Sequence, residues 1–89
     1  MAIFYIPRIA AEEWEAMKAL ITPCPAATHA EWLALQAKEV AEIRANQHST
    51  KMVDVAAADY ARYCSQRRDK RDIERLRGYV FEKATGKRY

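Results

Sequence analysis

The feature that most constrains the fold is a long stretch without proline. All three prolines, Pro7, Pro23 and Pro25, precede residue 26, and residues 26–89 contain only two glycines. The two strongest helix breakers are therefore almost absent from most of the chain. Alanine, the best helix former, occurs 17 times in the 89 residues. A β-sandwich or barrel would need many turns rich in Gly, Asn and Pro. We therefore predict a mainly α protein, a compact four-helix arrangement in one small helical domain spanning residues 1–89.

One segment departs from this helical pattern. Residues 2–6 read Ala-Ile-Phe-Tyr-Ile and are followed by Pro7. Aromatic and β-branched residues favour strands, and a proline biases the preceding residue towards an extended conformation. A single strand would leave its backbone groups unpaired. We therefore expect a short two-stranded β element that pairs residues 2–6 with residues 51–55. The alternative is pairing with the same segment of a second subunit.

The first two helices are separated by a connector rich in proline. The first is predicted over residues 10–21, and residues 22–25, Thr-Pro-Cys-Pro, end it. The second has the clearest start signal in the chain, because Thr28 is followed three residues later by Glu31, the pattern of a capping box. This helix is predicted to run to about residue 45.

The second helix carries a broad apolar face that also contains polar residues. Gln36 and Glu39 fall inside the apolar arc on a helical projection. A polar residue in such an arc forms a buried hydrogen bond, belongs to a site, or lies at the edge of the core with its end in water. We favour the last interpretation. The apolar face consists of Trp32, Leu33, Leu35, Val40 and Ile43.

Two further helices are predicted in the second half of the chain. One starts near residue 54 or 55 and ends near residue 68. The other is expected to be capped by Asp69 and to end at Gly86, since glycine readily adopts the left-handed conformation at a helix end.

Charge is distributed unequally along the chain. Residues 1–45 hold four Lys or Arg and six Asp or Glu, a net charge of −2, whereas residues 46–89 hold eleven and six, a net charge of +5. A basic surface of this kind could neutralise the phosphates of nucleic acid or meet an acidic partner protein. The basic residues that would form it are Arg62, Arg67, Arg68, Lys70, Arg71, Arg75 and Arg77.

Other features of the same stretch argue against nucleic-acid binding. Arg68 and Asp72 are four residues apart, as are Lys70 and Glu74, so these charges can pair on one helical turn. The turn between the two helices lacks the glycine often found in a helix-turn-helix motif. A solvated, partly self-paired surface is therefore favoured over a nucleic-acid site.

The sequence contains no pattern typical of a catalytic, cofactor or metal site. Cys24, His29 and His48 do not follow a zinc-binding spacing, and no glycine-rich loop is present to hold a phosphate. An enzyme would require Cys24, His29, Glu39 and His48 to converge in space. Cys24 and Cys64 form no disulfide framework, although one bridge between them stays open. We expect no catalytic, cofactor-binding or metal-binding residues.

These observations favour binding over catalysis. No targeting signal or membrane-spanning segment is predicted, so the expected location is the cytoplasm and no membrane partner is expected. The leading hypothesis is a small, non-enzymatic protein-interaction module with a protein partner or a homo-oligomer, such as a homodimer. It is motivated by the missing catalytic chemistry and by the many aromatic residues in a small helical frame. Nucleic-acid binding by the basic C-terminal half is the alternative.

Overall fold

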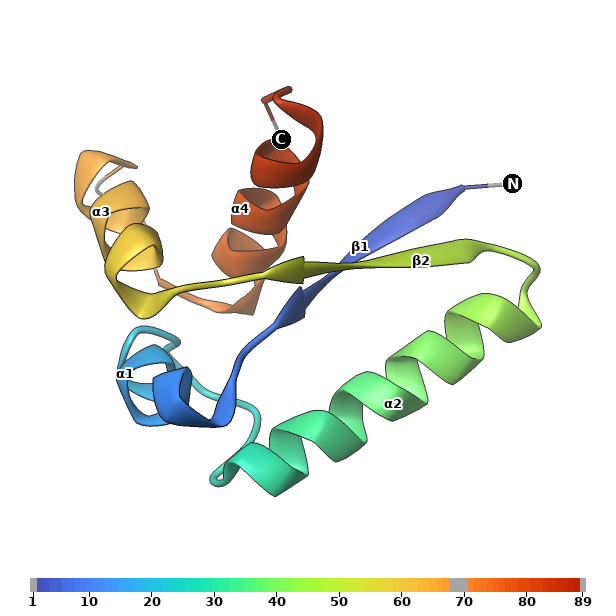
Figure 1. The fold of residues 1–89 in the computed structure, drawn as a ribbon, viewed down its shortest axis with the longest axis horizontal. Coiled ribbons are helices and arrows are strands. Elements are labelled where there is room, and N and C mark those ends of the chain that lie inside the picture. Colours follow the sequence, from blue (N-terminus) through green and yellow to red (C-terminus); the bar gives the residue numbers. More distant parts are fainter. Residues whose placement is uncertain (1, 68–70, 89) are drawn as a thin grey trace.

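The structure, a computed structural model, describes residues 2–67 and 71–88, without the side chain of Arg67. Two strands cross the middle of the molecule, with one long helix on one side and two helices on the other (Figure 1). This confirms a mainly α protein with a small sheet, in which the helices are arranged around the strands. The elements in chain order are β1 (Ile3–Arg8), the 3-10 helix η1 (Ala11–Glu13), α1 (Trp14–Ala19), α2 (His29–Ala45), β2 (Ser49–Asp54), α3 (Ala57–Arg67) and α4 (Ile73–Thr85).

The two strands form a parallel pair. Ile3 lies opposite Ser49, and the register continues to Arg8 opposite Asp54. The predicted pairing of residues 2–6 with residues 51–55 is therefore confirmed, with both strands slightly displaced from the predicted bounds. A parallel pair needs a long crossover connection, which α1 and α2 supply.

Two helices are shorter than predicted. The helix expected over residues 10–21 is a 3-10 turn followed by the six residues of α1. The helix expected from residue 54 or 55 starts only at Ala57, because the amide of Val55 still donates to the carbonyl of Arg8, at 3.0 Å, and so extends the strand pairing.

The start of α2 agrees with its predicted capping box. The Thr28 side chain accepts a hydrogen bond from the amide of Glu31, at 3.1 Å. The Glu31 carboxylate accepts one in return from the amide of Ala27, at 2.8 Å, one residue before the position that the motif usually uses. The helix ends at Ala45, as predicted.

The start of α4 differs from the prediction, and its end agrees with it. Asp69 lies outside the described residues, and the capping residue is Asp72, whose carboxylate accepts from the amide of Arg75 at 3.0 Å. At the other end, Gly86 has a φ of 73° and closes the helix in the left-handed conformation.

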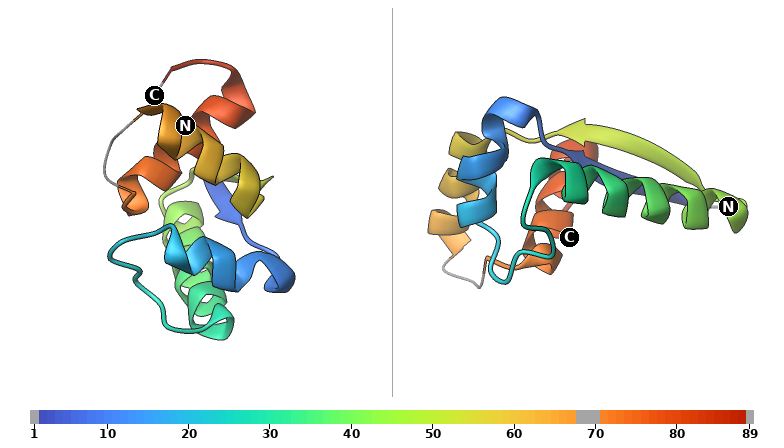
Figure 2. Two further views of the ribbon diagram at one scale, coloured as in Figure 1. Left: turned by 90° about the vertical axis from the view of Figure 1, so that its left-hand side faces the viewer. Right: turned by 90° about the horizontal axis from the view of Figure 1, so that it is seen from below.

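The core lies at the end of the sheet where the strands finish. There α1, α3, α4 and the first turns of α2 meet, whereas the start of both strands and the rest of α2 extend away from them (Figure 2). Trp14 and Trp32 pack with their ring centres 5.7 Å apart. Of the predicted apolar face of α2, only Trp32 is buried, while Leu33 and Leu35 are 47% and 44% exposed. Val40 and Ile43 are partly buried, so the described elements cover that face only in part.

A cluster of tyrosines joins α3 to α4. The ring of Tyr60 is fully buried, and its centre lies 5.3 Å from that of Tyr79. Burial, with the neighbouring Cys64 thiol as a lesser cause, raises the pKa of Tyr60 far above its usual value of about 10. Burial also raises the pKa of Tyr79.

We expect these buried phenols to limit stability in alkali. The folded state keeps its full stability below pH 10. It loses stability as the pH rises towards the raised pKa of the buried tyrosine, because in that range the tyrosine ionises only in the unfolded chain. For Tyr60, each pH unit between about 10 and the raised pKa costs about 1.4 kcal/mol of unfolding free energy. Tyr60→Phe should raise the midpoint of alkaline unfolding followed by circular dichroism. An unchanged midpoint would contradict this account.

Candidate functional site

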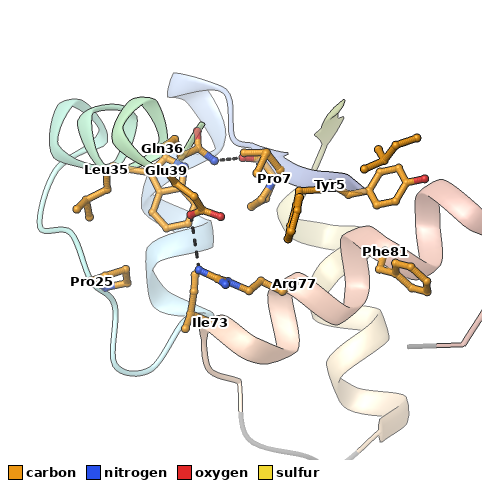
Figure 3. Close-up of a pocket in the computed structure, with 13 residues that line it drawn as sticks. Tyr5, Pro7, Pro25, Leu35, Gln36, Glu39, Ile73, Arg77 and Phe81 are labelled. Carbon is orange, nitrogen blue, oxygen red and sulfur yellow. Dashed lines mark hydrogen bonds and ion pairs between the residues drawn. The ribbon is translucent and has the colours of Figure 1, made fainter. Parts of the chain in front are cut away.

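An apolar groove lies along the outer edge of β1, between α2 and α4 (Figure 3). Residues 3–7 form its floor. Trp32 and Leu35 line it from α2, and Ile73 and Phe81 line it from α4. The volume of this open groove is about 490 Å³, which is within the range of ligand-binding pockets. We call this feature the β1 groove.

The hydrogen bonds between the strands determine which backbone groups of β1 point away from β2. The amide of Ser49 donates to the carbonyl of Ala2, at 2.9 Å. In a parallel pair every second residue of a strand bonds to its neighbour, so the even-numbered residues of β1 are the ones paired with β2. The outer edge of β1 therefore presents the backbone groups of Ile3, Tyr5 and Pro7.

The last position on this edge is already closed. Gln36 is only 8% exposed, and its side-chain nitrogen donates a hydrogen bond to the carbonyl of Pro7 (Figure 3). Pro7 has no N–H to donate, and a proline within a strand is tolerated where that position faces the open edge of the sheet. The expectation that Gln36 lies at the edge of the core with its end in water is therefore wrong. It forms a buried hydrogen bond between α2 and β1.

The other polar residue of that arc pairs across the groove. The Glu39 carboxylate lies 3.6 Å from the guanidinium of Arg77, so the pair links α2 to α4. Their side chains are 40% and 48% exposed, and an ion pair this exposed contributes at most about 1 kcal/mol. A ligand entering the groove could separate the two charges at little cost.

The two edges of the sheet differ in chemistry. On β2 the outward carbonyl of Asp54 accepts from the Lys83 ammonium at 2.6 Å, and Arg44 reaches the Thr50 hydroxyl at 3.5 Å. On β1, residues 2–7 carry no charge. Polar and charged groups on an edge strand oppose pairing with another chain, so the edge of β1 is the more favourable of the two edges for adding a strand.

The predicted basic residues do not gather in the groove. Four of them have described side chains: Arg62, Arg71, Arg75 and Arg77. Arg68, Lys70 and the side chain of Arg67 lie outside the described residues. The Arg62 guanidinium lies 3.6 Å from the Asp59 carboxylate, and that of Arg75 lies 5.9 Å from the ring centre of Tyr63. Arg77 alone lines the groove. Three of the four therefore already contact a neighbour on their own chain, and Arg71 is exposed.

Of the four residues that an enzyme would have to bring together, Glu39 pairs with Arg77 and the other three have separate backbone partners. A ring nitrogen of His29 hydrogen-bonds with the carbonyl of Ile9 at 2.7 Å, and His48 accepts from the amide of Ala2 at 3.1 Å. Cys24 donates to a carbonyl two residues further on, and both cysteines are free thiols. Within residues 2–67 and 71–88, no group of three or more His, Cys, Asp or Glu side chains is placed to hold a metal ion.

The β1 groove thus combines mostly apolar side chains and strand backbone with the Glu39–Arg77 pair, and the sequence gives little signal for such a site. None of the helices in the described part of the chain is long and apolar enough to cross a membrane. No protein-family model, curated protein or solved structure matches the chain.

The hydrogen bond from Gln36 to the Pro7 carbonyl should contribute measurably to the free energy of unfolding. Gln36→Met keeps the length of the side chain but removes the donor, so the Pro7 carbonyl loses its partner. We expect the free energy of unfolding to fall by about 1–3 kcal/mol. Urea unfolding followed by tryptophan fluorescence would measure the change. Gln66→Met, at an exposed position of α3, is the matched control and should change it by less than about 0.5 kcal/mol. Equal effects of the two substitutions would contradict the role of Gln36.

Proposed function

We propose that this chain is a small, non-enzymatic protein-interaction module that binds an extended polypeptide segment in the β1 groove. The single observation that carries the proposal is the open edge of β1, which runs along an apolar groove between two helices. An extended segment placed there would pair its backbone with the strand and its side chains with the walls. Addition of a strand to an exposed sheet edge is a common way in which proteins recognise peptides.

The chemistry of the groove favours a polypeptide over other ligands. Ile3 and Tyr5 offer backbone donors and acceptors at the spacing of a β-strand, which another strand matches along its whole length. The walls are mostly apolar, and the charges of Glu39 and Arg77 neutralise each other. A nucleic acid would need unpaired cations for its phosphates.

Exposed apolar side chains beside the groove also favour a polypeptide ligand. Ile3 is 59% exposed, Phe4 is 42% exposed, and Leu35 on the facing wall is 44% exposed. Large apolar residues grouped around a cleft are typical of protein-interaction sites. Binding of a segment in the groove would bury all three.

Leu35 and Leu33 provide a matched pair of positions for a test. Both are exposed leucines of α2, but Leu35 lines the β1 groove, whereas Leu33 lies on the opposite flank, beside Met52. A photo-reactive benzophenone residue at position 35, in protein produced in its native host, should cross-link to one protein. Mass spectrometry should place the link in a single extended segment, either of the chain itself or of another protein.

The same probe at position 33 serves as the control. It should leave that segment unlabelled, because Leu33 points away from the groove. If the two positions gave the same adducts, or if position 35 gave none, the groove would not be the interaction surface and the proposal would fail.

A further inference from the structure

We infer that the segment bound in the β1 groove is β1 of a second copy of this chain, paired antiparallel across a two-fold axis at Phe4. The inference rests on the proposed function of the groove and names its partner. The resulting sheet would have four strands in the order β2, β1, β1 of the partner and β2 of the partner. The argument depends on the hydrogen-bonding groups that the edge of β1 leaves available.

These groups are self-complementary. Ile3 and Tyr5 each direct one N–H and one C=O away from β2. When Ile3 lies opposite the partner subunit's Tyr5, the two residues exchange two hydrogen bonds, as residues of an antiparallel pair do. The two-fold axis generates the same exchange between Tyr5 and the partner subunit's Ile3. All the outward groups of these residues on both copies are then paired.

Pro7 and Gln36 disfavour a register shifted towards the end of the strand. A shift that placed Tyr5 opposite the partner subunit's Tyr5 would place Ile3 opposite the partner subunit's Pro7. That proline has no N–H, and its carbonyl already accepts from Gln36. The shifted register would therefore leave the amide and carbonyl of Ile3 without their partners, and burying such groups is unfavourable.

The side chains fit the same arrangement. Phe4 would meet the partner subunit's Phe4 at the axis, in a pair that shares no backbone hydrogen bonds and therefore brings its side chains close together. The partner subunit's Ile3 would lie beside Tyr5, whose ring centre is 6.0 Å from that of Phe81. Ile3, the most exposed large apolar residue in the part of the chain that the structure describes, would thus cover the groove wall. Because residues 2–7 are uncharged, no like charges meet across the axis.

The assembly should stop at two copies. After β1 pairs with its partner, the outer edges of the four-stranded sheet are those of β2. There Lys83 occupies the carbonyl of Asp54, and Arg44 contacts Thr50. Charged side chains on an edge strand oppose further addition, so a closed dimer forms instead of a fibre.

The inference is tested by proline substitutions on the two edges. Ile3→Pro removes an outward N–H of β1 without removing a hydrogen bond to β2, and Thr50→Pro does the same on the outer edge of β2. Light scattering at micromolar concentrations should show twice the mass of one chain for the wild type and for Thr50→Pro. Ile3→Pro should raise the dissociation constant of the dimer by roughly 10- to 100-fold, since each copy loses one hydrogen bond.

A cysteine substitution tests the register and does not depend on the folding of the proline variants. Cα atoms of a directly opposed antiparallel pair that shares no hydrogen bonds lie about 4.5 Å apart, close enough for a disulfide. Mild oxidation of Phe4→Cys should therefore give a covalent dimer, while Thr50→Cys, treated in the same way, should not.

Three results would overturn the inference: a monomeric wild type at high micromolar concentration, equal effects of the two prolines, or no covalent dimer of Phe4→Cys. The proposed function can be judged separately. If the wild type is a monomer but the probe at position 35 still links to another protein, only the inference of a second copy fails. If position 35 gives no adduct, the proposed function itself fails.

Discussion

The parallel pairing of β1 with β2 is the constraint on which the rest of the structure depends. Parallel strands cannot be joined by a tight turn, because the chain must return to the starting end of the sheet. α2 makes that return. Its 17 residues span about 25 Å, slightly more than the roughly 20 Å of a six-residue strand. The helix therefore lies along the full length of the sheet, although the core occupies only one end of it.

In a sheet of two strands both strands are edge strands, and here the two edges differ in chemistry. At the finishing end of the sheet, Gln36 occupies the outer carbonyl of β1 and Lys83 that of β2. At the starting end, β2 is polar and contacts Arg44, whereas β1 is apolar and exposed. We propose that this difference makes the backbone at Ile3 and Tyr5 the place where another chain adds a strand.

Local signals in the sequence predicted the parts of the fold that local interactions determine. The capping box at Thr28 and the glycine at Gly86 are satisfied within a few residues, so their spacing is sufficient to identify them. The cap of α4 was missed because Asp69 and Asp72 are equally suitable by residue type, and only the path of the chain decides between them. The pairing of the strands could be predicted because the chain offers only one other segment that favours a strand.

The β1 groove was not predictable in the same way. Gln36 stood out in an apolar arc, but its partner is a carbonyl 29 residues earlier, and that contact exists only once the strand lies across the helix. The basic residues gave the stronger signal in the sequence, yet three of the four with described side chains contact their own chain. In a chain of 89 residues the core is small, and Leu33 and Leu35 on the apolar face of α2 are exposed. Association at the β1 edge would bury further apolar surface at the starting end of the sheet, which lies away from the core.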